Sequence, residues 1–231
     1  MPVYRIPSKH IFPDPEQAEP SGLLGVGGDL HPARLVLAYS SGIFPWYSEG
    51  EPILWFSPDP RMVFRPGEVH VSRSLRKRLR QGRYRITMDT AFEEVIRACA
   101  GVPRAHQGGT WITADMQRAY IALHKLGVAH SVETWLGEEL VGGLYGISLG
   151  GMFAGESMFC TATDASKAAF VSMAQQLHRW GFTLIDGQLR TDHLASLGAF
   201  ELPRGAYLAQ LDAALACPTR RGPWSFDEPG R

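Results

Sequence analysis

The spacing of hydrophobic and polar positions predicts two differently organised parts of this chain. The first sixty residues are dense in proline, glycine and aromatic residues. Because proline fixes φ and removes a backbone donor, long helices and strands are not expected there. One short helix is predicted after Asp29, its expected cap, with Pro32 in its first turn. We therefore expect a small, turn-rich N-terminal domain over residues 1–61 and a larger domain over residues 62–231.

The larger domain alternates between strand-like and helix-like periods. Its expected strands are residues 62–65, 84–88, 129–136, 139–148, 151–159 and 182–185, and its expected helices are residues 72–80, 90–100, 113–126, 164–180, 193–197 and 204–215. Ser72 or Ser74 and Thr90 are the expected caps of the first two helices. The order of elements predicts an α+β fold with a mainly antiparallel central sheet flanked by helices. From Cys217 onward the chain is irregular, and we expect this tail to be loosely held.

Composition and charge exclude several classes of protein. The 231 residues carry a formal net charge of zero, so any contact with nucleic acid must come from a local basic patch. No run of about 18 apolar residues is present, and prolines interrupt the N-terminus, so we expect a cytoplasmic protein without a membrane span or signal peptide. The three cysteines form no CxxC pair and the eight histidines show no ligand spacing, so neither a metal nor a cofactor is expected.

Polar side chains interrupt two apolar, strand-like runs near the end of the larger domain. Glu156 lies within GESMF, and Asp186 and Gln188 lie within LIDGQ. A buried carboxylate costs several kcal/mol unless it is paired or hydrogen-bonded. These three residues therefore predict a polar site inside an apolar pocket, although a buried structural network would give the same pattern.

A strongly basic stretch covers residues 72–85. Half of its fourteen residues are Lys or Arg, and no acidic residue is interleaved with them. Such a stretch binds phosphate backbones through counterion release, or else forms a solvated helix face. The candidate phosphate contacts are Arg73, Arg76, Lys77, Arg78, Arg80, Arg83 and Arg85.

Aromatic and apolar residues supply two further candidate surfaces. Trp46, Tyr47 and Trp111 occur in proline- or glycine-rich loops, where flat rings stack on nucleobases or pack between domains. An apolar set from neighbouring strands and the long helix predicts either plain core or a pocket that accepts more than one side chain. This set is Leu144, Phe153, Met158, Phe170, Met173 and Ile185.

Three functional hypotheses follow from these residues. The first is an acetyl-CoA-dependent N-acetyltransferase, but the [QR]xxGx[GA] loop of these enzymes is absent, which weighs against this hypothesis. The glycine-rich GLLGVGGDL also lacks the spacing of a nucleotide-binding loop. A tRNA-binding module without catalysis needs the basic helix and the tryptophans but gives no role to Glu156, Asp186 and Gln188. The third hypothesis is an enzyme that binds nucleic acid and uses these three residues in its reaction site.

The motifs, taken together, resemble the bacterial leucyl/phenylalanyl-tRNA–protein transferase family over most of the chain, from Phe12 to Tyr207. The motifs that carry the resemblance are GLLGVGGDL, AYSSGIFPWY, PILWFSPDPR, HVSRSLRK, GTWIT, AHSVETW, LVGGLYG, GESMF, DASK, LIDGQ and SLGA. The chain has WFSPDPR where WWSPDPR is more usual, and Cys160 where Ser is usual. The resemblance implies a small N-terminal domain and a GNAT-like catalytic domain that has lost acetyl-CoA binding.

The resemblance also implies a reaction and a role for each candidate residue. Leu, Phe or, less often, Met would pass from aminoacyl-tRNA to a protein that begins with Arg or Lys, creating a degradation signal of the N-degron pathway. Asp186 would take or relay a proton or act electrostatically, Gln188 would orient the reactants, and Glu156 would hold the donor's α-amino group or form the pocket wall. The apolar set would bind the donor side chain and the basic element the acceptor stem. Trp46 and Trp111, together with Tyr39, would sandwich the terminal adenosine.

Overall fold

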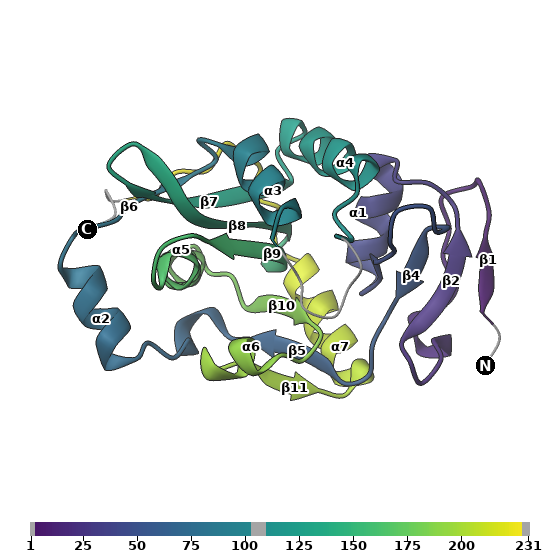
Figure 1. The fold of residues 1–231 in the computed structure, drawn as a ribbon. Helices are drawn as coiled ribbons and strands as arrows, with labels where there is room; N and C mark the ends of the chain where they lie inside the picture. Colours follow the sequence, from purple (N-terminus) through teal and green to yellow (C-terminus); the bar gives the residue numbers. More distant parts are fainter. Residues whose placement is uncertain (1–2, 103–109, 228–231) are drawn as a thin grey trace.

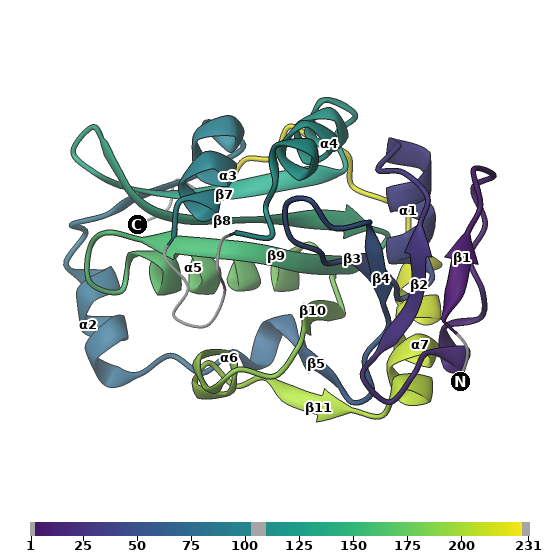
Figure 2. The ribbon, with the colours of Figure 1, turned by 45° about the vertical axis from the view of Figure 1, so that its right-hand side comes forward.

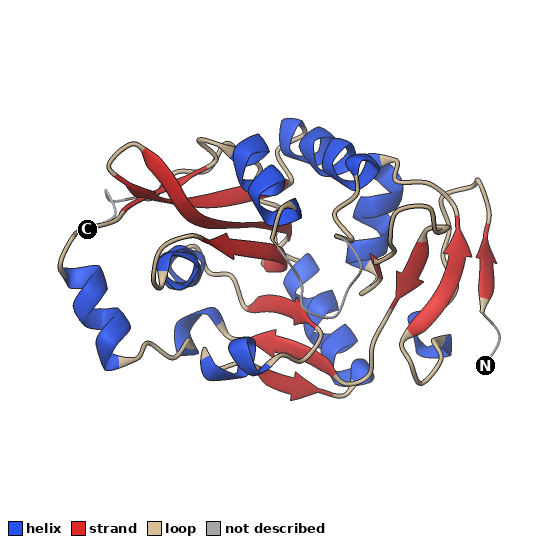
Figure 3. Ribbon diagram, viewed as in Figure 1, coloured by secondary structure: helices blue, strands red, loops and turns tan. Residues whose placement is uncertain are grey.

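The computed structural model describes residues 3–102 and 110–227, which form two sheets of different size. A four-stranded sheet contains the N-terminal strands, and a seven-stranded sheet contains the others (Figures 1 and 3). The smaller sheet has the order β1-β2-β4-β3, and the larger has the order β11-β5-β10-β9-β8-β7-β6. In the larger sheet only β9 and β10 pair in parallel. The predicted α+β fold with a mainly antiparallel central sheet is confirmed.

The N-terminal part contains short elements around one helix. Its elements are β1 (Tyr4–Ile6), η1 (Pro15–Gln17), β2 (Leu23–Gly27), α1 (Pro32–Ser40), β3 (Phe44–Pro45) and β4 (Leu54–Phe56). The fully buried guanidinium of Arg34 holds the segment before η1, because it donates to Asp29 and to the backbone carbonyls of residues 7–9. The four strands were not predicted, since strands of two to five residues in a proline-rich segment give no readable period.

The larger sheet is formed by the predicted strands and one additional strand. Its strands are β5 (Arg61–Phe64), β6 (Arg85–Met88), β7 (Ala129–Leu136), β8 (Glu139–Leu149), β9 (Met152–Cys160), β10 (Leu184–Gln188) and β11 (Phe200–Leu202). The three-strand meander is formed by β7, β8 and β9, as predicted. The unpredicted β11 pairs with β5 at the sheet edge.

Helices cover both faces of the larger sheet. They are η2 (Pro66–Glu68), α2 (Arg73–Arg80), α3 (Phe92–Ala100), α4 (Ala114–Lys125), α5 (Ala165–Arg179), α6 (Asp192–Ser196) and α7 (Arg204–Leu215). The long α5 packs on one face, and α3 and α4 pack on the other, next to α1 (Figure 2). Two hydrophobic clusters result, one on each face of the sheet. No described helix is long and apolar enough to span a bilayer.

Two predicted helix caps are wrong, and one is right. The cap of α1 is His31, whose Nδ1 accepts from the N–H of Ala33, while Asp29 is occupied by Arg34. Thr90 does not cap α3, because its hydroxyl donates to the buried Glu133 carboxylate. Ser72 caps α2 through the N–H of Leu75. At both wrong positions the side chain forms another bond in place of the capping bond: Asp29 pairs with Arg34 of the same helix, and Thr90 with the distant Glu133.

The prediction of a loosely held tail is also wrong for the described residues up to 227. Trp224 is 3% exposed and stacks on the imidazole of His130, with 3.6 Å between ring centroids. An aromatic side chain of this size contributes strongly to stability when it is buried. Residues 228–231 of the predicted tail lie outside the described part of the chain.

Candidate active site

Strands β9 and β10 separate halfway along their length, and a cavity lies where they part. They pair only between residues 152–154 and 184–186, although β9 continues to Cys160 and β10 to Gln188. The cavity has a volume of about 390 Å³ and is lined by residues on both sides of the split. Its size is that of a small-molecule site in a protein.

Both strands carry a bulge beside the cavity. In β9 the register against β8 shifts so that Glu156 has no residue opposite it. In β10 the register against β5 shifts between Asp186 and Gln188, which leaves Gly187 unpaired in the ladder. Gln188 itself adopts the left-handed backbone region with φ of +62°. Bulges redirect side chains at strand ends, and a non-glycine residue with positive φ is uncommon, so this corner of the sheet is specialised.

Asp186 forms a saturated ion pair beneath the cavity. Its Oδ1 accepts from Arg61 Nε and from the backbone N–H of Gln188, both at 2.9 Å. Its Oδ2 accepts from Arg61 Nη2 at 2.7 Å and from the Tyr207 hydroxyl at 2.9 Å. Asp186 and Arg61 are each 1% exposed, and although burial opposes it, the carboxylate raises the pKa of Arg61. Asp186 is therefore neutralised by a cation, and each of its oxygens already accepts two hydrogen bonds.

Glu156 has a different environment in the same site. Its Oε1 accepts from Gln188 Nε2 at 2.8 Å, and its Oε2 accepts from the Tyr120 hydroxyl at 2.9 Å. Tyr120 in turn shares a very short hydrogen bond with Tyr39. No ion pair to Glu156 is found within the described ranges. Burial raises the pKa of Glu156 to about 7, although the hydroxyls of Tyr39 and Tyr120 oppose this rise.

The structure brings the predicted polar residues together with the predicted apolar set. Glu156, Asp186 and Gln188 line the cavity, and Gln188 connects the two carboxylates. The apolar set lines it as well, from β8, β9, α5 and β10: Leu144, Phe153, Met158, Phe170, Met173 and Ile185. The cavity is thus an apolar slot with a polar corner.

Two of the four candidate aromatics lie at this cavity. Trp46 and Trp111 line it. Tyr39 does not line it; this residue is 1% exposed, and its hydroxyl contacts Tyr120 and the Glu156 carboxylate, so its place beside an adenosine stays a prediction. Tyr47 is also turned away from the cavity, and its hydroxyl contacts Thr113. Trp46 and Tyr47 are adjacent in the chain, and their side chains point in opposite directions, so only Trp46 lines the cavity.

The basic stretch forms α2 and the loop after it, apart from the cavity. Four of its side chains surround one surface depression: Arg73, Arg76, Lys77 and Arg80. Two others have acidic partners that the local sequence did not show, because Arg78 pairs with Asp164 and Arg85 lies 3.9 Å from Glu138. These partners lie outside residues 72–85, so the absence of interleaved acidic residues does not leave these two arginines without ion pairs.

Sequence reasoning missed three residues of the polar network. Arg61 begins an otherwise apolar strand, so the criterion that found Asp186 also applies to it. Tyr120 and Tyr207 gave no such signal, because a tyrosine on the apolar face of a helix is indistinguishable from core. No cluster of His, Cys, Asp and Glu suited to a metal ion is found among the residues that the structure describes.

Comparison with known proteins gives consistent matches over the whole chain. The model of the family "Leucyl/phenylalanyl-tRNA protein transferase" matches residues 63–212, and the model of its N-terminal domain matches residues 28–59. A leucyl/phenylalanyl-tRNA–protein transferase of Anaeromyxobacter sp. (strain Fw109-5) is 59% identical over 227 residues, covering 98% of this chain and 97% of that protein. One of Myxococcus xanthus (strain DK1622) is 56% identical, covering 97% of both.

Solved structures give weaker matches. L-PGS from Bacillus licheniformis matches with a TM-score of 0.40 and 12% identity, covering 70% of this chain and 50% of that one. A GCN5-related N-acetyltransferase from Kribbella flavida matches with a TM-score of 0.38 and 14% identity, covering 78% of this chain and 63% of that one.

Proposed function

Because this chain belongs to the leucyl/phenylalanyl-tRNA–protein transferase family, we propose that it transfers Leu or Phe from aminoacyl-tRNA to the N-terminus of an acceptor protein. The observation that supports this activity best is the apolar slot with the Glu156, Gln188 and Asp186 corner. Met is a further donor, and acceptors begin with Arg or Lys. The product enters the N-degron pathway in the cytoplasm, where aminoacyl-tRNA is available.

The apolar slot binds the donor side chain. It is lined by flexible Met158 and Met173 together with the ring of Phe170, which adapt to Leu, Phe or Met. Side chains branched at Cβ are wider at the entrance, although one methylene usually discriminates by only about 1–3 kcal/mol. Trp46 and Trp111 lie at the same cavity, and their rings suit stacking on the terminal adenosine.

The reaction needs alignment more than strong acid or base catalysis. The neutral α-amine of the acceptor attacks the ester carbonyl carbon, a C–N bond forms, and the C–O bond to the terminal ribose breaks. The released ribose oxygen takes up one proton, and the amine nitrogen loses one. Correct positioning of two bound reactants can supply about 7–11 kcal/mol of the barrier.

Asp186 acts as an orienting group in this proposal. Since its oxygens already accept from Arg61, Tyr207 and the N–H of Gln188, it has no free position for the proton of an attacking amine. Asp186 instead accepts the backbone N–H of Gln188 and so holds this residue in its left-handed backbone conformation. The Gln188 amide then keeps its side-chain oxygen for the incoming amine, because its nitrogen donates to Glu156.

Glu156 holds the α-amino group of the donor. Its carboxylate lines the slot, and the hydrogen-bond donors described around it, Tyr39, Tyr120 and Gln188, are all neutral. Burial raises the pKa of Tyr120 well above its usual 10, so this hydroxyl stays a donor. An ammonium group of the donor would supply the missing positive charge, and such charge-assisted hydrogen bonds are about twice as strong as neutral ones.

The transfer reaction itself provides the direct test of this function. Labelled Leu-tRNA and Phe-tRNA are incubated with the full chain and peptides that begin with Arg, Lys or Ala. We expect labelled product with Arg and Lys peptides only, and none with an Arg peptide whose α-amine is acetylated. RNA binding without any transfer would instead favour a non-catalytic tRNA-binding module, and calorimetric binding of acetyl-CoA would favour an acetyltransferase.

The α2 surface binds phosphates of the acceptor stem, and its removal should weaken RNA binding uniformly. In a variant with Arg76, Lys77 and Arg80 each replaced by Gln, we expect the slope of log K against log salt to fall by about 1 for each lost contact. Fluorescence anisotropy with labelled tRNA at several salt concentrations measures both the affinity and its salt slope.

A matched control removes three exposed arginines elsewhere. Arg65, Arg97 and Arg118 lie in exposed ion pairs away from α2, and their replacement by Gln changes the net charge equally. If the control lowered the salt slope as much as the α2 variant, tRNA binding would reflect overall charge and not this surface.

A further inference from the structure

Hydrogen bonds from three residues of the C-terminal segment after α7 attach it to loops beside the larger sheet. The Thr219 hydroxyl accepts from the N–H of Gly150 at 2.9 Å, and the N–H of Gly222 donates to the carbonyl of Gly127 at 3.1 Å. The N–H of Trp224 donates to Asp89 Oδ2 at 2.6 Å. This strap, residues 217–227, lies beyond the region matched by the family model, which ends at residue 212.

The strap ends on α5. The Asp227 carboxylate accepts from the indole N–H of Trp180 at 2.9 Å and from Gln176 Nε2 at 2.6 Å. The guanidinium of Arg220 lies 4.1 Å from the centre of the Trp180 ring. The strap therefore bridges the start of β7 and the last turn of α5, the helix that also lines the donor slot.

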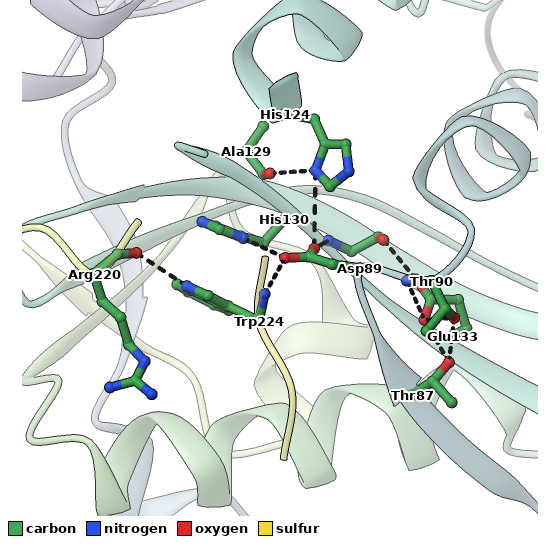
Figure 4. A network of polar contacts seen from close by, with 10 residues as sticks. Thr87, Asp89, Thr90, His124, Ala129, His130, Glu133, Arg220 and Trp224 are labelled. Atoms are coloured by element: carbon green, nitrogen blue, oxygen red, sulfur yellow. Dashed lines mark hydrogen bonds and ion pairs between the residues drawn. The ribbon is translucent and has the colours of Figure 1, made fainter. Parts of the chain in front are cut away.

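Trp224 fills the space between these two attachments. Figure 4 shows its ring parallel to that of His130, with its backbone N–H bonded to Asp89. Its indole N–H donates to the Arg220 carbonyl at 3.0 Å, so both N–H groups of the residue have acceptors. The ring belongs to the same hydrophobic cluster as the slot residues on α5 and β9.

One residue of that cluster contacts both Trp224 and the slot. The Phe153 ring lines the cavity and lies 6.1 Å from the Trp224 ring, measured between centroids. Gly146 on β8 leaves room for it, since a Cβ there would lie 2.6 Å from Phe153 Cζ. Phe153 is therefore held between Gly146, Trp224 and the cavity. Without Trp224 the ring has space to move out of the slot wall.

We infer that Trp224, at the end of the C-terminal strap, is a positioning residue that sets the width of the donor slot through Phe153. This inference rests on the proposed function, because it assigns the slot to the donor side chain. If the slot widens by about the size of one methylene group, the ratio of kcat/KM for two donor side chains of different size should change by about tenfold. This is the lower end of the range usual for one methylene. Trp224 thus favours the smaller Leu over Phe.

The test compares kcat/KM for Leu-tRNA and Phe-tRNA in the full chain and in Trp224→Ala. We expect the Leu:Phe ratio to fall by about tenfold in Trp224→Ala and to stay within about twofold of the wild type in Trp224→Phe, which keeps a ring on His130. Leu24→Ala is the control, because Leu24 is a fully buried core residue of the N-terminal sheet and does not line the slot. It should lower Tm and leave the ratio unchanged.

The outcomes separate this inference from the function on which it rests. A purely structural role would lower the active fraction for both donors equally, so an unchanged Leu:Phe ratio in a folded Trp224→Ala protein would overturn the inference alone. A ratio that moves equally in Leu24→Ala would also overturn it. Absence of any transfer by the wild type would instead remove the proposed function.

Discussion

Replacing Asp186 with Ala is expected to abolish transfer of Leu, lowering kcat/KM by about 100-fold or more, since small misplacements of reactants have effects of this size. The same change is expected to lower the free energy of unfolding by about 3–5 kcal/mol, because it leaves a buried guanidinium without its carboxylate. Arg61 is 1% exposed, so water cannot replace the lost partner. Binding of tRNA should persist in the folded fraction.

A compensated variant separates the two effects. In the double variant Arg61→Met with Asp186→Leu, both buried charges are replaced by apolar side chains, which is often close to neutral for stability. We expect urea unfolding to show most of the lost stability restored, while transfer of labelled Leu stays absent. Wild-type-like transfer by the double variant would contradict an orienting role for Asp186 and leave it as part of the core.

Replacing Glu156 with Gln is expected to stabilise the protein at alkaline pH. Burial raises the pKa of Glu156 from an ordinary 4.5 to about 7. Between these pH values Glu156 is ionised in the unfolded chain but keeps its proton in the folded chain. The free energy of unfolding therefore falls as the pH rises, and this loss is complete above about pH 7. The full difference corresponds to about 3 kcal/mol. Gln cannot ionise, so the variant should gain up to about that amount at pH 8 and nothing at pH 4.

The same substitution is expected to impair the reaction. Loss of a charge-assisted hydrogen bond to the donor's α-amino group should lower kcat/KM by about 10- to 100-fold. In the wild type this bond strengthens as Glu156 ionises, so the ratio of wild-type to variant activity should rise with pH through about 7. Deprotonation of the acceptor amine raises the activity of both proteins alike and cancels in this ratio. Denaturant titrations and transfer assays from pH 5 to 8 measure both. If the two proteins shared one pH dependence of stability, Glu156 would not be the titrating group.

Much of the fold and part of the site are local properties of the sequence. The meander of β7, β8 and β9 was predicted from strand-like runs separated by turn residues, and the helix α3 was predicted from apolar residues at helical spacing. Glu156 and Asp186 were predicted to be site residues because charges are rare in apolar strands, and the structure places both at the cavity. The domain boundary near residue 61 remains a proposal. Its position is supported by the break between the two sheets after β4 and before β5.

The geometry of the slot could not be predicted from alternation along β9. Phe153 and Met158 are five residues apart, so an unbroken strand would place them on opposite faces of the sheet. Both nevertheless pack on the α5 side, because the bulge at Glu156 reverses the alternation between them. A bulge depends on the partner strand, and the residues that form one look like ordinary strand residues in the sequence.

The sequence by itself determined which residue types are available: two carboxylates and an amide in apolar strands, a basic helix and a set of apolar side chains. Tertiary structure alone decided their partners. Asp186 forms a buried ion pair with Arg61, 125 residues away, whereas Glu156 meets only hydroxyl and amide donors, and burial raises its pKa. The tail likewise became part of the core through His130 and α5. The physical reason is that burial and ion pairing depend on neighbours in space, which local sequence does not specify.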